Sequence, residues 1–553
     1  MRLRPEPGER LAWLLDLTFA GRIWRFASET MEVTDGSSTR TYLAGLAGLR
    51  VRLEAEPLST SPSPPTAQIE VVWPESVAAL IALGHDLSAA TAELSMHRVG
   101  IDRTWREVVI AGRVVEPDYD EILNPDGSRH SLVTFTVEWA PWDDRATHPA
   151  PSAVVSADTW PDRLPDHDGR VYPTVWGRPG SYREADGTAI VAPGSPALIV
   201  EYSSVGEIAT KLLIAGHRVV SANVTLMYRD DAVMGGWSTE VVDVTHETDG
   251  LGQLCAVVDI SAEVLAIQQA GDYWICWNQN SGSLLSDIDG AELSTMGHLI
   301  EWWLGRSVDR IDRARLASVR PMLDRWKVAG YADEAVSPWD YVADNLLPLV
   351  PVSVAVGPDG LYLVPWRWDS TATVATITEG PGVAHVGPVQ YQAPPWERCN
   401  RRTIRWALDA ASNEYLRRTT IGPSPDPEDP DAIGSLVVEQ SATRLGVLDG
   451  EDLTTDIVPD RDGAALTLLW RAARDAASRR RVVFDCPADY AWIRPGDVVH
   501  LVSAHLLIDA AADVIAVELD DHCRARLELE IRPAPPTTGS VVPIGDDDIV
   551  LPQ

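Results

Sequence analysis

The chain has 553 residues, too many for one hydrophobic core, so three or four domains are expected. Hydrophobic residues make up 45% of the sequence, which indicates globular domains rather than disorder. The 46 lysines and arginines stand against 81 acidic residues, giving a formal net charge of -35. This acidic balance argues against a general DNA-binding surface, because such surfaces are basic.

The cysteines are spread singly, with no CxxC pair and no Cys/His cluster at metal-ligand spacing. We therefore expect reduced, mostly buried thiols in a protein made in a cytoplasm. No secretory signal fits the first residues. No apolar run approaches the roughly 20 residues of a transmembrane helix, so a soluble protein with no membrane span is expected. The cysteines are Cys255, Cys276, Cys399, Cys486 and Cys523.

Residues 1–150 are mostly strand-like. One short helix is predicted over Ser76–Leu83, and a turn at Asp35-Gly36 separates two early strands. A long strand, Glu107–Glu116, is then followed by a return strand, Ser131–Trp139. This order of elements predicts a β-barrel with a packed helix.

Residues 151–289 are predicted to form an inserted β-rich domain. A proline- and aspartate-rich passage opens it, and the turns Gly235-Gly236 and Asp249-Gly250 fit hairpins. The strand-like stretches are Ala197–Tyr202, His217–Tyr228, Trp237–Thr245, Leu254–Ile260 and Tyr273–Asn278.

Residues 290–388 are predicted to form a small α+β domain. Ser337 is expected to cap a helix that has Pro338 at its first position. A hairpin across Gly357–Gly360 closes the segment. The predicted helices are Leu293–Leu304, Asp309–Val319 and Trp339–Leu347.

Residues 389–533 repeat the order of a helix followed by antiparallel strands. An amphipathic helix opens the stretch Asp462–Pro533, and the apolar spacing then changes from helical to alternating. In the turn Arg494–Asp497, Gly496 is expected to take a positive φ. We therefore predict two β-barrels of similar order, at 1–150 and 389–533. Residues 534–553 are predicted to be an acidic flexible tail.

Motifs of catalysis are absent from the sequence: there is no GxSxG, HExxH, P-loop or dinucleotide fingerprint. Asp166–Gly169 offers imidazole and carboxylates to a metal, but a polar surface turn is the favoured interpretation. Asp287–Gly290 resembles part of a calcium loop without its glutamate, and His246-Glu247 lacks a second histidine. Acidic pairs such as Asp143-Asp144 suit glycoside hydrolysis, yet they arise by chance in so acidic a chain. We predict no catalytic, cofactor-binding or metal-binding residues, and no enzyme.

The sequence contains 21 tryptophans and four phenylalanines. Clusters such as Trp139/Trp142, Trp302-Trp303 and Trp366/Trp368 suit either sugar stacking or cores and subunit interfaces, and the second use is favoured. Adjacent helical residues point about 100° apart. One of Trp302 and Trp303 is therefore expected to contact another chain.

The C-terminal stretch resembles the last domain of tailed-phage hub proteins, which lie at the tail tip or baseplate. The resemblance rests on the helix with a basic end, the strand after it, the turn Pro495–Val499 and the final antiparallel pair. Three further segments, Val133–Asp144, Tyr172–Gly180 and Tyr331–Leu347, are similar to hub proteins of long-tailed phages and gene transfer agents.

The resemblance implies a mainly β, multidomain fold: two tail-tube-like β-barrels with packed helices, an inserted β domain and an α+β domain. It implies a structural, trimeric hub that joins a sixfold tail tube to a threefold tip and forms part of the DNA ejection channel. The implied partners are the distal tail protein and tail tube, the tape measure protein and tip or fibre proteins. DNA would be met only in transit, in a virion assembled in the host cytoplasm.

A second hypothesis is a tail protein that binds envelope carbohydrate or degrades peptidoglycan, with the second segment supplying a cleft. The net charge also has two interpretations. Carboxylates either line the path of DNA and repel it, or they keep a large protein soluble.

Overall fold

The computed structural model places most of the chain, and every structural statement below concerns the residues that it describes. These residues are 9–57, 59, 65–102, 106–125, 129–138, 146–184, 186–205, 208–220, 222–229, 236–260, 267, 272–277, 284–285, 290–308, 310–357, 359–366, 372–392, 398–425, 431–476, 479–532, 541–542 and 549–550. Within them, no helix has the length and apolar character needed to cross a membrane.

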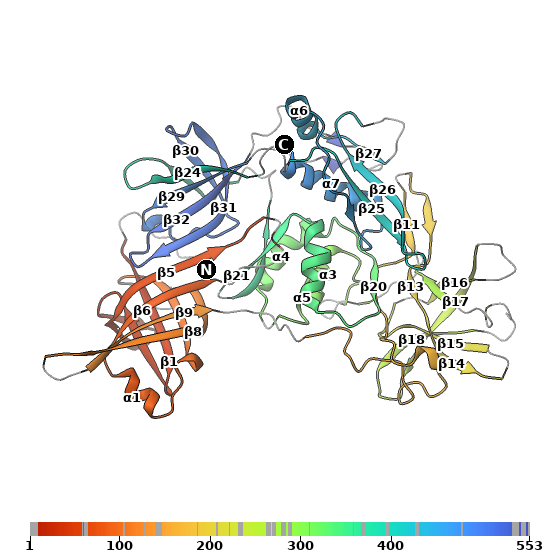
Figure 1. Ribbon diagram of the computed structural model, residues 1–553, viewed down its shortest axis with the longest axis horizontal. Coiled ribbons are helices and arrows are strands. Elements are labelled where there is room, and N and C mark those ends of the chain that lie inside the picture. The colour runs from red at the N-terminus through yellow and green to blue at the C-terminus, as the bar shows by residue number, and fades with distance from the viewer. Residues whose placement is uncertain are drawn as a thin grey trace.

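The fold is mainly β and multidomain, which confirms the predicted fold class (Figure 1). Strands from both ends of the chain form one 15-stranded sheet, here called the joint sheet. Its N-terminal strands are β1 (Leu11–Phe19), β2 (Arg22–Ala27), β3 (Met31–Asp35), β4 (Ser38–Ala44), β5 (Leu46–Glu54), β6 (Thr66–Trp73), β7 (Thr91–Arg98), β8 (Glu107–Leu123) and β9 (Arg129–Glu138), with helix α1 (Val77–Ala82) between β6 and β7. Its C-terminal strands are β23 (Ala375–Thr378), β24 (Ala384–Gln392), β29 (Arg479–Cys486), β30 (Val498–Ser503), β31 (Ile508–Asp520) and β32 (Ala525–Ile531).

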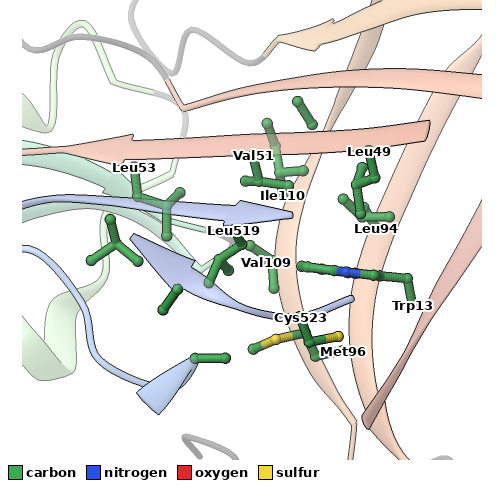
Figure 2. Packing of buried hydrophobic residues seen from close by; sticks show 14 of the residues in the cluster. Trp13, Leu49, Val51, Leu53, Leu94, Met96, Val109, Ile110, Leu519 and Cys523 are labelled. Carbon is green, nitrogen blue, oxygen red and sulfur yellow. The ribbon is translucent and has the colours of Figure 1, made fainter. Parts of the chain in front are cut away.

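The joint sheet runs in the order β24-β29-β32-β31-β5-β6-β9-β8-β7-β1-β2-β4-β3, with β30 beside β31 and β23 beside β30. The two sets of strands meet where β31 pairs antiparallel with β5, from Ala516 opposite Glu54 to Asp520 opposite Arg50. One hydrophobic core lies beneath both sets. Trp13 and Cys523 both belong to this core (Figure 2), and the Trp13 indole donates a hydrogen bond to the Asp520 carbonyl oxygen at 2.9 Å.

Alternating burial explains why these segments form a two-faced sheet. In β5 the side chains of Leu49, Val51 and Leu53 are buried, whereas Arg50 and Arg52 between them are exposed. Apolar and polar residues that alternate with a period of two place one set in the core and the other in solvent.

A second, seven-stranded sheet is built from the middle of the sequence, in the order β13-β19-β16-β17-β18-β15-β14. We call it the inserted sheet (right side of Figure 1). Its strands are β13 (Ser195–Pro196), β14 (Leu198–Ser203), β15 (Ile208–Ala215), β16 (Asn223–Arg229), β17 (Trp237–Thr248), β18 (Leu254–Asp259) and β19 (Tyr273–Cys276). Short pairs join β10 (Thr174–Trp176) to β20 (Gly330–Ala332) and β11 (Ser181–Arg183) to β12 (Ala189–Val191).

The centre of the molecule is an α+β region with a core of its own. Its elements are α3 (Met296–Leu304), α4 (Arg313–Leu323), α5 (Pro338–Tyr341), β21 (Val352–Gly357), β22 (Gly360–Pro365), β25 (Arg402–Asp409), β26 (Glu414–Ile421), β27 (Ala432–Ile433), α6 (Leu436–Leu445), β28 (Leu453–Thr454) and α7 (Arg461–Asp475). A four-stranded sheet in the order β27-β26-β25-β28 belongs to it.

Helix α7 packs into this central core rather than standing apart with the strands that follow it in sequence. The Trp326 indole donates to the Thr467 hydroxyl at 3.0 Å, and that hydroxyl donates to the Leu349 carbonyl oxygen at 2.9 Å. The helix is buried over most of its surface, so it needs partners on more than one side. The division into domains at 1–150, 151–289, 290–388 and 389–533 remains a prediction.

The expectation that Trp302 or Trp303 contacts another chain was wrong, because it rested on the premise that both cannot face one core. Their exposed fractions are 3% and 0%. Helix α3 has core on several sides: the Arg306 guanidinium lies 3.3 Å from the centre of the Trp302 ring, and Trp303 stacks on Tyr341 with centres 4.4 Å apart.

Several local predictions are confirmed. Gly496 has a φ of 84°, and Gly36 takes a positive φ in the turn between β3 and β4. Ser337 accepts a hydrogen bond from the Asp340 amide at 3.3 Å, with Pro338 at the first helical position. Strand β8 is longer than predicted because it continues to Leu123 past a bulge. Within 534–553, a short pair joins β33 (Val541–Val542) to β34 (Ile549–Val550), and the rest lies outside the described residues.

Candidate functional site: the charged face of the joint sheet

Eight neighbouring strands of the joint sheet, from β24 to β8, present their polar side chains on the side away from the core. We call this surface the charged face. It draws on both ends of the chain, since β24, β29, β32 and β31 lie on one side of the join and β5, β6, β9 and β8 on the other. Its exposed or half-exposed charged members in the described residues include Arg50, Arg52, Glu54, Glu70, Arg113, Asp118, Asp120, Glu138, Asp485, Glu518, Asp520, Arg526 and Glu528.

The register of the strands places opposite charges beside each other across the join. Reading across the sheet, residues opposite one another are Asp485, Arg526, Glu518, Arg52, Thr66, Glu138 and Arg113. Negative and positive groups alternate along this row on both sides of Thr66. Each such cross-strand pair contributes about 0.2–1 kcal/mol, so the row favours this register over a slipped one.

Direct ion pairs hold most of the arginines on this face. The guanidinium of Arg526 lies 2.8 Å from the Asp485 carboxylate, and that of Arg50 lies 2.9 Å from Glu518. Arg52 pairs with Glu54 at 2.8 Å. The face is therefore densely charged, yet these arginines are already engaged by carboxylates.

A shallow groove of about 330 Å³ opens on the charged face beside β24. Strand β24 shifts register against β29 between Val386 and Gln390, where Gly387 takes a positive φ and Pro388 follows it. Proline and bulges are typical of edge strands, where no neighbour needs the missing hydrogen bond. The groove is lined by Arg50, Arg52, Val386, Gly387, Pro388, Gln390, Val483, Ala516, Glu518, Arg526 and Glu528.

At one end of the charged face, next to α7, lies a buried ionic cluster around Glu530, whose side chain has an exposed fraction of 0%. Its carboxylate lies 2.9 Å from Arg479, 3.2 Å from Arg481 and 3.1 Å from Arg474 of α7. Burial alone would raise the pKa of Glu530, but the three guanidinium groups outweigh it and hold the pKa below its usual value. Arg481 also reaches Glu56, just past β5, at 2.9 Å. The cluster thus ties the central helix to both sides of the join.

Two further ion pairs are nearly shielded from water. Arg532 donates two hydrogen bonds, of 3.0 and 2.6 Å, to the Asp513 carboxylate of β31. Arg494, in the turn before β30, pairs with Glu107 at the start of β8 and donates to the Ala491 carbonyl oxygen at 2.6 Å. A two-point guanidinium–carboxylate contact fixes orientation as well as distance. The Arg532 pair fixes the end of β32 against β31, and the Arg494 pair links the C-terminal strands to the N-terminal strand β8.

The candidates weighed from sequence for metal or catalytic chemistry serve structural contacts here. His167 accepts a hydrogen bond from the Ile199 amide at 2.7 Å, and Asp168 pairs with Arg163 at 2.7 Å. His246 accepts from the Val219 amide at 3.1 Å, while Glu247 binds Lys211. No group of three or more His, Cys, Asp or Glu side chains in the described part of the chain is arranged to hold a metal ion. The pairs Asp143-Asp144 and Trp139/Trp142, residues 287–289 and Trp368 lie outside the described residues.

The sequence analysis named no site residue, and the charged face was missed. A signal for it is present in two stretches that alternate charged and apolar residues, Arg50–Glu54 and Arg526–Glu530. The alternation alone predicts an exposed charged strand face. It does not show that the two stretches belong to one sheet, because contacting residues such as Arg50 and Glu518 lie 468 positions apart along the chain.

No protein-family model matches the chain, and no curated protein matches it. Among solved structures it is similar to the tail protein from Neisseria meningitidis MC58, with 9% sequence identity and a TM-score of 0.38 over 94% of this chain and 96% of that chain. The 43 kDa tail protein of prophage MuSo2 from Shewanella oneidensis is similar at 11% identity and a TM-score of 0.34, over 94% and 98% of the two chains. A chain in the virion of a native gene transfer agent particle is similar at 11% identity and a TM-score of 0.37, over 68% of this chain and 88% of that one.

Proposed function

We propose that the protein is a structural hub at the tail tip or baseplate of a tailed phage, and that it has no enzymatic activity. Three copies surround a channel, and the charged face of each copy lines it. The observation that carries this proposal is the join of β31 to β5, which makes one continuous surface from two sets of strands. Two sets per copy give six in a trimer, the number needed to match a sixfold tube.

The chemistry of the charged face suits a wall past which DNA slides. Among the described residues, its carboxylates outnumber its guanidinium groups, and Arg50, Arg52 and Arg526 each have a carboxylate partner. Free cations would hold phosphates by releasing counterions from the duplex, and transit would slow. A wall of paired arginines and additional carboxylates repels the duplex, and a narrow tube concentrates that field.

The proposal includes the partners that the sequence resemblance implies. These are the distal tail protein and tail tube on one side, tip or fibre proteins on the other, and the tape measure protein within the channel. The copies assemble in the host cytoplasm and remain in the virion. DNA is met only in transit.

Purified particles test the assignment. Gold-labelled antibody against this chain should mark one end of the tail, and light scattering of the purified protein should give the mass of three chains. Absence of the chain from particles contradicts a hub. A monomer that releases fragments from peptidoglycan or envelope polysaccharide would instead favour the alternative of a carbohydrate-binding or wall-degrading tail protein.

A further inference from the structure

Strands β8 and β31 hold equivalent places in the two halves of the joint sheet. The first part of β31 pairs with β30 as far as Asp513, and the first part of β8 pairs with β7 as far as Arg113. Each strand then carries a bulge, between Val514 and Ala516 in β31 and between Val115 and Asp118 in β8. Each keeps one neighbour throughout its second part, β32 or β9. Both strands are therefore built to change partners at the bulge.

The partner change is completed in β31 but not in β8. Beyond its bulge, β31 takes β5 as its new neighbour on the side that β30 has left. In β8, no strand of the described chain pairs with the corresponding edge after Arg113. Three large apolar side chains lie along this uncovered part: Tyr119, Ile122 and Leu123 are 36%, 39% and 66% exposed. A long edge with exposed apolar residues is a template for another strand.

The strand that would complete the pattern is β24. The C-terminal half runs β24-β29-β32-β31 and the N-terminal half runs β5-β6-β9-β8, so β24 holds the place of β5. In the described chain, its edge away from β29 has no strand neighbour. The edge of β24 and the edge of β8 lie at the two outer limits of the charged face, so they cannot meet within one copy.

We propose that the second part of β8 in one copy pairs antiparallel with β24 of the next copy and repeats the β31–β5 join between molecules. The inference deepens the proposed function, since it names the contact by which the hub closes its ring. The contact uses two different surfaces, so it adds copies head to tail and closes where the rotation permits. Three copies would then carry six joins, three within chains and three between them.

The register of the β31–β5 pairing within one chain also predicts the register of the β8–β24 pairing between chains. Asp513 and Arg113 end equivalent pairings, and Glu530 and Glu138 lie opposite them on the neighbouring strands. Glu518 faces Arg526, four positions before Glu530, and Asp118 faces Thr134, four positions before Glu138, so Asp118 holds the place of Glu518. Gln390 holds the place of Arg52. Because Glu518 faces Arg52, Asp118 of one copy is expected opposite Gln390 of the next. Both residues are exposed in the single chain.

Disulfide cross-linking tests this register, because residues directly opposite on paired strands come close enough for a bond. Chains carrying Asp118→Cys are mixed with chains carrying Gln390→Cys and oxidised. A linked dimer should form in the mixture and not from either variant alone. The double variant should give linked dimers and trimers on a denaturing gel. The five native cysteines are buried, and the pKa of each thiol is raised by burial, so they should compete little.

A matched control places the second cysteine on the same face but away from the edge: Glu70→Cys mixed with Gln390→Cys should not cross-link. A disulfide between two Asp118→Cys chains would overturn the proposal, since it needs like edges to meet. A trimer by light scattering without the predicted cross-link would overturn the strand contact and leave the hub assignment standing. A monomer at all concentrations would also overturn the contact, whereas labelling of particles decides the hub assignment independently.

Discussion

Two parts of the charged face use the same residue types in opposite settings. In the exposed part, Arg50 and Glu518 meet with 61% and 18% of their side chains exposed. In the part next to α7, Glu530 is wholly buried among three arginines. An exposed ion pair contributes little to stability, whereas removal of one partner from a buried set leaves charge stranded in a medium that solvates it poorly. Charge in the buried part therefore stabilises the architecture, and charge in the exposed part determines what the surface presents.

The largest effect is expected from Glu530→Ala. Arg474 and Arg479 would lose their shared carboxylate, and Arg481 would keep only its contacts with Glu56 and Glu528. Breaking a buried ionic set in this way costs about 3–5 kcal/mol. Chemical denaturation followed by tryptophan fluorescence measures the free energy of unfolding. A loss below about 1 kcal/mol would mean that water reaches the cluster, and the contrast between the buried and exposed parts of the face would fail.

A second effect concerns the turn that carries Arg494. Gly496 has a φ of 84°, and a Cβ at this position would lie 2.2 Å from Val364 Cγ1. Gly496→Val therefore combines backbone strain with overpacking, and we expect a loss of about 2–4 kcal/mol in the free energy of unfolding. Gly446→Val is the matched control. Its φ is 79° with open space around it, so only the backbone cost should appear. Equal losses in the two variants would exclude a steric role for Val364.

The local features of this region could be predicted from the sequence, and its long-range contacts could not. The Pro-Gly turn dictated a positive φ at Gly496, and alternation marked strands such as Leu46–Glu54. The join itself pairs Glu518 with Arg52, and no local pattern specifies a partner strand so far along the chain. Helix α7 shows the same limit, because an apolar helix face does not reveal which core it meets. Most of the candidate site is defined by such pairings, so its residues were missed.

The inserted sheet should lose stability at a higher pH than the joint sheet when the solution is acidified. His217 Nε2 accepts a hydrogen bond from the Val175 amide at 3.0 Å, and burial, with Arg306 and His246 nearby, lowers the pKa of His217 to about 4. Its folded pKa lies below the unfolded value of 6.5, so its contribution is complete above pH 6.5 and falls as the pH drops toward 4. Between pH 7 and pH 5, the free energy of unfolding of the inserted sheet should fall by an amount on the order of 1–2 kcal/mol.

Glu530 affects the stability of the joint sheet in a lower pH range. Its folded pKa lies below the unfolded value of 4.5, so its contribution is present above pH 4.5 and is lost only as the pH falls through the folded value. Hydrogen exchange at pH 7 and pH 5 should therefore show loosening around β16 to β18 before any change in β29 to β32. In the His217→Gln variant, the difference in hydrogen exchange of the inserted sheet between pH 7 and pH 5 should be smaller. Loosening of both sheets together at pH 5 would contradict this separation.

A small effect is expected when one ion pair of the charged face is removed. Glu518→Ala and Arg50→Ala should each change the free energy of unfolding by about 1 kcal/mol or less, and a double-mutant cycle should give a coupling of about 0.2–1 kcal/mol. The coupling should shrink in high salt, because exposed charges are screened. A coupling of 3 kcal/mol or more, roughly the value for a buried pair, would show that the face is not solvated.

Because these charges add little stability, their sign can be changed while the fold is kept, and this gives the sharpest test of what the face does. In Glu70→Arg combined with Glu138→Arg, two exposed or half-exposed carboxylates become cations on neighbouring strands. The melting temperature should change by no more than a few degrees, since surface substitutions usually shift stability by about 0.5 kcal/mol or less. Affinity for duplex DNA should nevertheless appear at low salt and fall steeply as salt is added, because each new cation releases a counterion from the duplex. The parent chain and a Glu240→Arg variant on the exposed inserted strand β17 are the controls, and neither should retain DNA to the same extent. If the parent already binds duplex DNA through the charged face, the wall would hold the duplex rather than repel it, and the proposed role of that face in transit would fall.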